Sequence, residues 1–339
     1  MSPRVSRFAP QPVVLPIAGG KGGVGRSVVA ANLALALARL DHRVILIDAD
    51  LGGADLHNLL GLANDRPGLG EVLTGRGLAV GEVVAPLAEP RLAFCPGDAM
   101  VPAAANPGFQ KKRKLLHAIA HLDADFVLLD LGAGASITVM DFFLASPLGL
   151  VVLPPERIAM DNARNFLKNA AFRALERALG GNSACDRILA GYQARGRGPE
   201  AMQMAELAAE LEAAHPGGGL RARRALERVR PKLVLNRARR LDDFAHARQL
   251  ADWAAAELGL MAEVLGFLPE DAINAAAAAA GAPALEIDPR APFCQAMARL
   301  GLAIGQWAGR GAQWALQRDF TGGFERAATE FAGVFTAGG

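Results

Sequence analysis

The sequence predicts an α/β fold in which helices flank a mostly parallel, doubly wound sheet. Short apolar runs of strand length alternate along the chain with longer segments of helical composition. Two of these runs end in acidic residues. This is typical of buried parallel strands, whose carboxyl ends place functional side chains at one edge of the sheet. A glycine-rich loop joins the first strand to the first helix. With 339 residues and no internal repeat, the chain is long enough to bury a large core.

Composition narrows the class of protein. Hydrophobic residues make up 52% and charged residues 21%, which indicates a globular chain. The net charge of +2 gives no whole-protein reason to expect a nucleic-acid ligand. The three cysteines lie far apart, which argues against an iron–sulfur or zinc site and for a reducing compartment: Cys95, Cys185 and Cys294. Because the sequence shows neither a signal-peptide pattern nor a membrane span, we expect a cytoplasmic protein.

The glycine-rich loop is the strongest functional signal. The apolar run Val13 to Ile17 leads into the loop, and Val28 to Leu37 follows it with helical composition. The pattern Gly20-x4-Gly25-x-Ser27 favours a phosphate loop, since glycines let backbone N–H groups curl around phosphate oxygens at a helix N-terminus. The hydroxyl of Ser27 would then bind Mg²⁺.

The same loop resembles a known family. Lys21-Gly-Gly-Val-Gly-Arg26-Ser27 is similar to the deviant Walker A motif of the MinD/ParA ATPases, in which an extra lysine reaches the nucleotide of the partner subunit. Lys21 occupies that position, whereas Arg26 stands where the family has its P-loop lysine. We therefore expect this departure to slow ATP hydrolysis more than it weakens ATP binding. The resemblance implies a homodimer formed with ATP, ATP and Mg²⁺ as cofactors, and catalytic roles for Lys21, Arg26 and Asp50. It also implies nucleotide binding by this loop set: Gly20, Lys21, Gly22, Gly23, Val24, Gly25, Arg26, Ser27 and Val28.

Two strands deliver the carboxylates. The run Arg43 to Asp50 ends in Asp48 and Asp50, at the sheet edge where α/β proteins bind ligands. Asp50 matches the family residue that orients the attacking water, and Asp48 is placed to hold Mg²⁺ water. The continuation Leu51 to Asn58 resembles the flagellar number regulators of the family.

The run Phe126 to Asp130 repeats this pattern. Asp130-Leu-Gly-Ala-Gly134 follows the Asp-x-x-x-Gly form of a Walker B and switch II turn, whose acid holds a magnesium ligand water and whose glycine senses the γ-phosphate. The predicted metal-binding residues are Ser27, Asp48 and Asp130.

Two further segments are predicted to be scaffold: a helix in Pro67 to Gly75 and a strand Arg91 to Cys95. The other predicted elements are a helix in Asn106 to Leu122, a strand Leu148 to Leu153 and a helix Ile158 to Leu179. The basic cluster Lys111 to Lys114 favours a solvated face over a partner site.

Residues 180–230 are predicted to be a helical insertion packed beside the sheet. Glycine and proline breakers surround two helices, Ala201 to Ala214 and Leu220 to Arg230. Residues 221–240 contain nine basic residues and one acid. This segment leaves two alternatives open, nonspecific DNA binding and a solvated face.

Two further strands, Lys232 to Asn236 and Met261 to Leu268, enclose a helix from Asp243 to Leu258. In the MinD/ParA family an asparagine at the end of the first strand reads the adenine edge, and the loop after the second packs against the ring. The matching nucleotide-binding positions are Asn236, Arg237, Pro269, Glu270 and Asp271. We expect residues 1–290 to form the P-loop NTPase domain.

Residues 291–339 are predicted to be a C-terminal helical tail. Apolar residues at spacings of three and four indicate a helix that covers the sheet: Phe293, Met297, Leu300, Ile304 and Trp307. Four phenylalanines follow: Phe320, Phe324, Phe331 and Phe335. For residues 311–339 the alternatives are a membrane surface, an unknown protein partner and the protein's own domain, and the surplus of one acid disfavours anionic lipid.

We therefore predict an ATP-binding, slowly hydrolysing switch that dimerises around nucleotide and positions or regulates a cellular assembly, with the flagellum as one candidate. Two alternatives stay open: a ParA-like positioning ATPase that rides on DNA, and a hydrolysis-impaired scaffold that responds to nucleotide. The expected location is the cytoplasm, with peripheral attachment to the inner membrane as an alternative.

Overall fold

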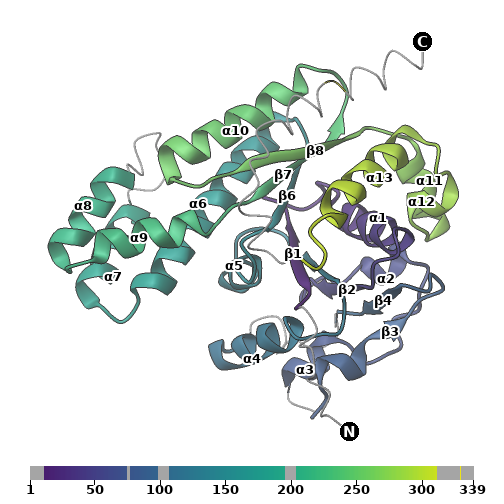
Figure 1. The fold of residues 1–339 in the computed structure, drawn as a ribbon, viewed down its shortest axis with the longest axis horizontal. Helices are drawn as coiled ribbons and strands as arrows, with labels where there is room; N and C mark the ends of the chain where they lie inside the picture. The colour runs from purple at the N-terminus through teal and green to yellow at the C-terminus, as the bar shows by residue number, and fades with distance from the viewer. Residues whose placement is uncertain (1–10, 75–76, 98–106, 195–203, 311–328, 330–339) are drawn as a thin grey trace, which may run out of the picture.

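The computed structural model describes residues 11–74, 77–97, 107–194, 204–310 and 329. Within them one eight-stranded sheet has the order β3-β4-β2-β5-β1-β6-β7-β8, with helices on both faces (Figure 1). Every neighbouring pair is parallel except β3 with β4. The predicted fold class, a mostly parallel doubly wound sheet flanked by helices, is confirmed.

The strands are β1 (Val13–Ala18), β2 (Val44–Ala49), β3 (Ala85–Pro86), β4 (Leu92–Cys95), β5 (Phe126–Leu131), β6 (Leu150–Leu153), β7 (Lys232–Ala238) and β8 (Glu263–Pro269). The helices are α1 (Arg26–Arg39), α2 (Leu56–Leu59), α3 (Leu69–Thr74), α4 (Phe109–Ile119), α5 (Ile137–Phe143), α6 (Arg157–Leu179), α7 (Ser183–Ala194), α8 (Met204–Ala214), α9 (Gly218–Glu227), α10 (Asp243–Leu258), α11 (Ile273–Ala280), α12 (Ala284–Ile287) and α13 (Pro292–Gly305), with a 3₁₀ turn at Val80–Val83.

The strand order sets the place of the glycine-rich loop. β1 lies between β5 and β6, and its residue Ile17 is level with Asp130 on one side and Leu150 on the other. Asp48 of β2 is level with Asp130 as well. Because parallel strands end at the same edge, the loop after β1 and both acidic strand ends meet there.

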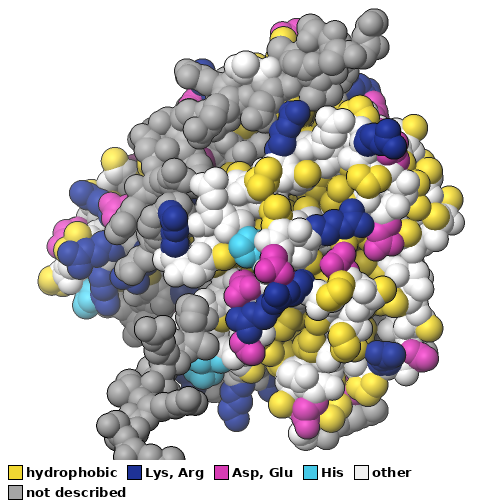
Figure 2. Space-filling view, turned by 45° about the vertical axis from the view of Figure 1, so that its right-hand side comes forward, with side chains coloured by type: hydrophobic (Ala, Val, Ile, Leu, Met, Phe, Trp, Pro, Cys, Tyr) yellow, Lys and Arg dark blue, Asp and Glu magenta, His cyan; other side chains and the backbone are white. Residues whose placement is uncertain are grey.

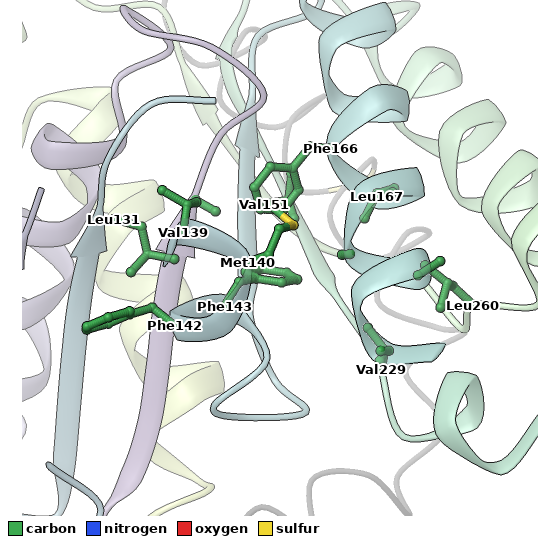
Figure 3. Packing of buried hydrophobic residues seen from close by; sticks show 14 of the residues in the cluster. Leu131, Val139, Met140, Phe142, Phe143, Val151, Phe166, Leu167, Val229 and Leu260 are labelled. Atoms are coloured by element: carbon green, nitrogen blue, oxygen red, sulfur yellow. The ribbon is translucent and has the colours of Figure 1, made fainter. Parts of the chain in front are cut away.

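A large apolar core lies on one face of the sheet, between the strands and α4, α5, α6 and α10. Short helix α5 contributes Met140, Phe142 and Phe143, which pack toward the strands and α6 (Figure 3). The rings of Phe143 and Phe166 meet edge to face with centroids 4.9 Å apart. Full burial of such a side chain stabilises the fold by roughly 1.5–3 kcal/mol, so this packing helps to hold α5 in place.

Helices α1 and α13 form the core on the other face. The predicted apolar stripe is confirmed, since all five of its members are buried: Phe293, Met297, Leu300, Ile304 and Trp307. The two helices approach closely, because a Cβ at Gly301 would lie 3.0 Å from the Cβ of Ala36. Residues 311–328 and 330–339, which carry the predicted membrane or partner contact, lie outside the described residues.

The insertion differs from its prediction. The structure has three helices here, α7, α8 and α9, where two were expected; α7 and α9 contact the long helix α6, and α8 packs on α7 and α9 (Figure 1). The missed helix α7 begins after Asn182, whose side-chain oxygen accepts hydrogen bonds from the N–H groups of Ala184 and Cys185. It buries Cys185, Leu189 and Tyr192, which share one helical face. Gly191 and the flanking glycines weakened this signal in the sequence.

Two basic side chains from the basic clusters of the sequence are buried. Lys112, from the cluster assigned to a solvated face, is 6% exposed and pairs with Asp141, whereas Lys111, Arg113 and Lys114 are exposed as predicted. Lys232, counted in the basic segment, is buried and pairs with Glu263. On the face shown in Figure 2, basic and acidic side chains lie side by side and form no single-sign patch. No helix among the described residues is long and apolar enough to cross a membrane.

Candidate functional site

The loop between β1 and α1 has a shape that only glycines allow at several positions. Gly23 and Gly25 adopt positive φ angles of 77° and 90°, and Gly25 caps the start of α1. A Cβ at Gly20 would lie 2.4 Å from the carbonyl oxygen of Asn162 in α6. At Gly23, by contrast, an added Cβ would meet nothing within 4 Å, so the loop stays open on that side. The loop is thus tightly supported from behind and accessible in front.

Asn236 supports the loop from the end of β7. Its side-chain amide donates a hydrogen bond of 2.9 Å to the carbonyl of Val24, and the residue is buried. A Cβ at Gly25 would lie 2.4 Å from the same amide nitrogen. The structure therefore brings Asn236 to the predicted phosphate loop, and adenine recognition by this residue stays a prediction.

Ser27 and Asp130 lie together beneath the loop. The hydroxyl of Ser27 hydrogen-bonds to the Asp130 carboxylate, which is 2% exposed. Burial raises the pKa of Asp130 to about 6, although Ser27 and the charge of Arg26 oppose the rise. Oxygen Oδ1 of Asp130 is buried without a hydrogen-bond partner among the described residues. A buried carboxylate oxygen in this state fits a nearby cation or its water ligand.

Asp48 has a different environment. Its Oδ1 accepts a hydrogen bond from the N–H of Asp50, and its Oδ2 accepts one from the N–H of Leu56, both at 3.1 Å. Burial and the charge of Asp130 raise the pKa of Asp48 to about 7, against these two backbone bonds. The carboxylate thus fixes the path of the chain after β2, and metal binding by Asp48 stays a prediction.

Arg26 reaches away from the loop to the ends of β5 and β2. Its Nη1 donates to the carbonyl of Leu131 at 2.5 Å, and its Nη2 lies 4.0 Å from Oδ2 of Asp50. The stem of the side chain crosses Gly19, where an added Cβ would lie 3.1 Å from the Arg26 Cγ and Cδ atoms. The arginine is 8% exposed. It links the phosphate loop to the predicted switch II segment and to the predicted water-orienting acid.

A pocket of about 180 Å³ opens beside Asp50. Residues of the loop after β2 form one side of it, and the loop after β5 with the first turns of α5 forms the other. The lining includes Asp50, Gly52, Gly132, Ser136, Thr138 and Val139. The switch II segment and Asp50 thus face each other across a space that water can enter.

The remaining predicted residues are placed as follows. Lys21 is exposed on the loop, and no ion pair joins it to another residue in the part of the chain that the structure describes. Arg237 is exposed and adopts a positive φ of 57° at an irregularity of β7.

The loop after β8 contains the last predicted residues. Glu270 forms an ion pair with Arg239. Asp271 accepts hydrogen bonds from the N–H groups of Ile273 and Phe293, which ties α11 to α13. Nucleotide contacts by Arg237 and Pro269 to Asp271 stay predictions.

The residues at the loop fit Mg²⁺ and a nucleotide phosphate chain. Ser27 and Asp130 offer hard oxygen ligands, and the open face of the glycine loop offers backbone N–H groups. Proteins hold magnesium through one or two side chains, while water and phosphate fill its other positions. No group of three His, Cys, Asp or Glu side chains in the described residues converges to enclose a metal.

A strand, a glycine loop and a helix, with a serine and a buried acid at the base of the loop, define a P-loop NTPase. The ParA family model, described as NUBPL iron-transfer P-loop NTPase, matches residues 12–175. Residues 12–175 belong to the ParA/MinD family of P-loop NTPases.

Known relatives include two curated bacterial proteins. The antiactivator FleN of Pseudomonas aeruginosa is 34% identical over 163 residues, which are 46% of this chain and 55% of that protein. The flagellum site-determining protein YlxH of Helicobacter pylori is 31% identical over 159 residues, which are 45% of this chain and 51% of that protein. The chain thus spans about half the length of the curated relatives it matches.

Among solved structures, the septum site-determining protein MinD of Pyrococcus horikoshii, complexed with Mg-ADP, has a TM-score of 0.60 and 19% identity. The match covers 88% of this chain and 98% of that one. This similarity shows that the two chains share a fold.

Three contacts of the site were not predicted from the sequence: the approach of Asn162 to Gly20, the bond from Arg26 to the Leu131 carbonyl, and the wall formed by Ser136 and Thr138. The first two involve backbone atoms, which leave no residue-specific pattern. The N-capping Ser136, two residues after Gly134, was the one available signal for the wall.

Proposed function

We propose that this protein is an ATP-binding switch that dimerises around nucleotide, hydrolyses it slowly and positions or regulates a cellular assembly. The observation that carries the proposal is the pairing of Ser27 with buried Asp130 beneath an open glycine loop. The likeness to FleN and YlxH makes the flagellum the first assembly to examine.

The roles of the residues follow from their positions. The loop amides would bind the phosphates, Ser27 would hold Mg²⁺, and Asp130 would hold a water ligand of the ion. The ion would neutralise charge on the phosphate oxygens. Asp50, at the rim of the pocket, orients a water molecule. Lys21, exposed and unpaired among the described residues, contacts the nucleotide of a second copy.

Iron transfer, which the family model's description names, is not proposed for this chain. Its three cysteines are buried on separate elements and the chain contains no others: Cys95 on β4, Cys185 on α7 and Cys294 on α13. A cluster carrier needs thiolates that converge at an accessible site.

Asp130→Asn is expected to abolish the gain in ADP affinity that Mg²⁺ provides. The amide keeps the shape but loses the charge that attracts the ion, so we expect a Mg²⁺-dependent gain of about tenfold or more to fall below about twofold. Calorimetric titration of ADP with Mg²⁺ and with a chelator measures both values.

Asp161→Asn is the control, because Asp161 is an exposed acid of α6. It should retain the full gain. An undiminished Mg²⁺ effect in Asp130→Asn would remove this residue from the metal site, and absence of nucleotide binding by the wild type would overturn the proposed function.

Lys21→Ala is expected to lower the dimer fraction in ATP and Mg²⁺. Ser27 and the loop amides hold the phosphates from within the chain, which leaves the exposed Lys21 charge for use across an interface. Sedimentation velocity of the wild type, Lys21→Ala and Lys111→Ala measures the effect; Lys111 is an exposed lysine of α4. Equal dimer fractions in all three proteins would contradict the role of Lys21.

The alternative is a positioning ATPase that binds DNA nonspecifically. Three exposed arginines in α9 and at its C-terminal end favour it: Arg221, Arg224 and Arg228. The basic segment is smaller than its composition suggests, however, because Arg239 and Arg240 pair with acids and Lys232 is buried. Duplex binding with ATP that falls steeply with salt would favour this alternative over a solvated face.

A further inference from the structure

A buried charge cluster joins three helices next to the candidate pocket. Asp141 of α5 accepts a hydrogen bond from Nζ of Lys112 of α4 at 2.6 Å on one oxygen. Its other oxygen accepts one from Nε of Arg173 of α6 at 2.7 Å. The side chains of Asp141 and Lys112 are each 7% exposed, and that of Arg173 is 20% exposed. One carboxylate therefore holds α4, α5 and α6 together.

The cluster extends to the helical insertion. Arg173 also donates to Glu176 at 3.0 Å, and Gln193 of α7 donates to the other oxygen of Glu176 at 2.8 Å. With Lys112 and Asp141, these side chains form a continuous series from α4 to α7, and Asp141 of α5 contacts two of its members.

Asp141 is charged in this setting. Burial acts to raise the pKa of Asp141, but the hydrogen bonds and charges of Arg173 and Lys112 outweigh it and lower the pKa. Buried ion pairs seldom stabilise a fold more than apolar packing of equal volume, because each charge loses its hydration. Charge-assisted hydrogen bonds do impose short, directional contacts. Fixed geometry is therefore the specific contribution of this cluster.

The position of α5 matters to the pocket. The helix has seven residues, and isolated helices shorter than about 12 residues are marginal in water, so tertiary contacts must hold it. Its Thr138, Val139 and Phe142 line the pocket opposite Asp50. Asp141 lies one turn after Thr138, on the helix whose Met140 and Phe143 pack in the core (Figure 3). The core packing and the charge cluster together set the place of the pocket wall.

We propose that Asp141 is a positioning residue of the site. Held by Lys112 and Arg173, it fixes α5, and through α5 the switch II segment 131–136 that follows Asp130. Asp141 does not touch the nucleotide site itself. The consequence for hydrolysis rests on the proposed function, whereas the anchoring of α5 does not.

Asp141→Asn keeps the shape of the side chain and removes its charge. In the nucleotide-free full chain, we expect hydrogen–deuterium exchange of residues 131–143 to rise about tenfold, because α5 opens locally. Glu263→Gln is the matched control. Glu263 pairs at 2.8 Å with Lys232, whose side chain is 1% exposed, at the first residues of β8 and β7, at the opposite end of the strands from the site. It should lower the melting temperature without changing exchange in 131–143.

Lys112→Met serves as a second variant, because Asp141→Asn removes the acid that pairs with buried Lys112 and leaves Arg173 with Glu176. It removes the link to α4 and keeps the Asp141–Arg173 pair. We expect a smaller rise in exchange over the same segment and a protein that folds.

Turnover and affinity complete the test. Asp141→Asn and Lys112→Met should lower ATP turnover more than they lower ADP affinity, since ADP is held by the loop amides and Ser27, and Glu263→Gln should change neither. The positioning role would be overturned if hydrogen–deuterium exchange of residues 131–143 were no faster in Asp141→Asn and Lys112→Met than in Glu263→Gln. If the wild type bound no nucleotide, the proposed function would fail, and the exchange comparison would still decide whether Asp141 anchors α5.

Discussion

Asp50→Ala is expected to leave ATP bound, to trap the ATP-bound dimer and to lower turnover by about 10²–10⁴-fold, the usual contribution of a positioned acid or base. The Asp50 side chain is 27% exposed and lines the pocket, whereas the proposed phosphate site consists of the glycine loop and Ser27. Removal of Asp50 should therefore take away the group proposed to orient water and leave the proposed binding contacts in place. Single-turnover hydrolysis, with sedimentation of the same samples, measures both effects.

Asp55→Ala is the control for this variant. Asp55 is an exposed acid five residues further along the same loop, and its side chain makes no capping hydrogen bond to α2. It should turn over ATP like the wild type. If Asp50→Ala also hydrolysed ATP at a rate within about threefold of the wild type, general-base assistance by Asp50 would be excluded.

The sequence predicted the meeting of Ser27 with Asp130, because two rules fix it. A parallel strand delivers its last residues to the same edge as its neighbours, and a helix that begins at Arg26 points its first turn toward that edge. The same rules placed Asp48 and Asp50 nearby. They did not give the partners of each carboxylate, which depend on the path of the chain after β2.

The sequence did not predict the buried state of Lys112. Four consecutive basic residues indicate a solvated face, and only the tertiary packing of α4 on α5 turns one of them inward. Asp141 offered a signal, since an acid within the apolar run Ile137 to Phe143 requires a partner if it is buried. The identity of that partner could not follow, because residues 29 positions apart meet only through the fold.

Arg26→Lys is expected to raise ATP turnover by about tenfold while changing ATP affinity less. In the structure the Arg26 guanidinium is held by the Leu131 carbonyl and lies 4.0 Å from the Asp50 carboxylate. To stabilise charge on the departing γ-phosphate, it must give up the first contact and weaken the second. Both partners belong to the proposed hydrolysis machinery, since Leu131 lies in the predicted switch II segment and Asp50 is the proposed water-orienting group.

Lysine changes this balance through its shape. Its ammonium is a compact point charge on a flexible stem, and it lacks the planar fork that engages a carbonyl and a carboxylate together. It can therefore turn toward the phosphates without a competing pair of contacts. The loop amides and Ser27 are untouched, so binding changes less than catalysis.

Arg39→Lys is the matched control for Arg26→Lys. Arg39 lies at the other end of α1, donates to the carbonyl of Leu285 at 3.0 Å and lies 3.8 Å from the carboxylate of Glu89. The same exchange there removes a similar set of contacts far from the loop, so turnover should stay at the wild-type level. Nucleotide affinity from calorimetry and turnover from phosphate release must be measured separately for both variants. If Arg26→Lys left turnover unchanged or lowered it, the contacts of Arg26 with Leu131 and Asp50 would not restrain hydrolysis, and the arginine would serve the phosphates as well as lysine does.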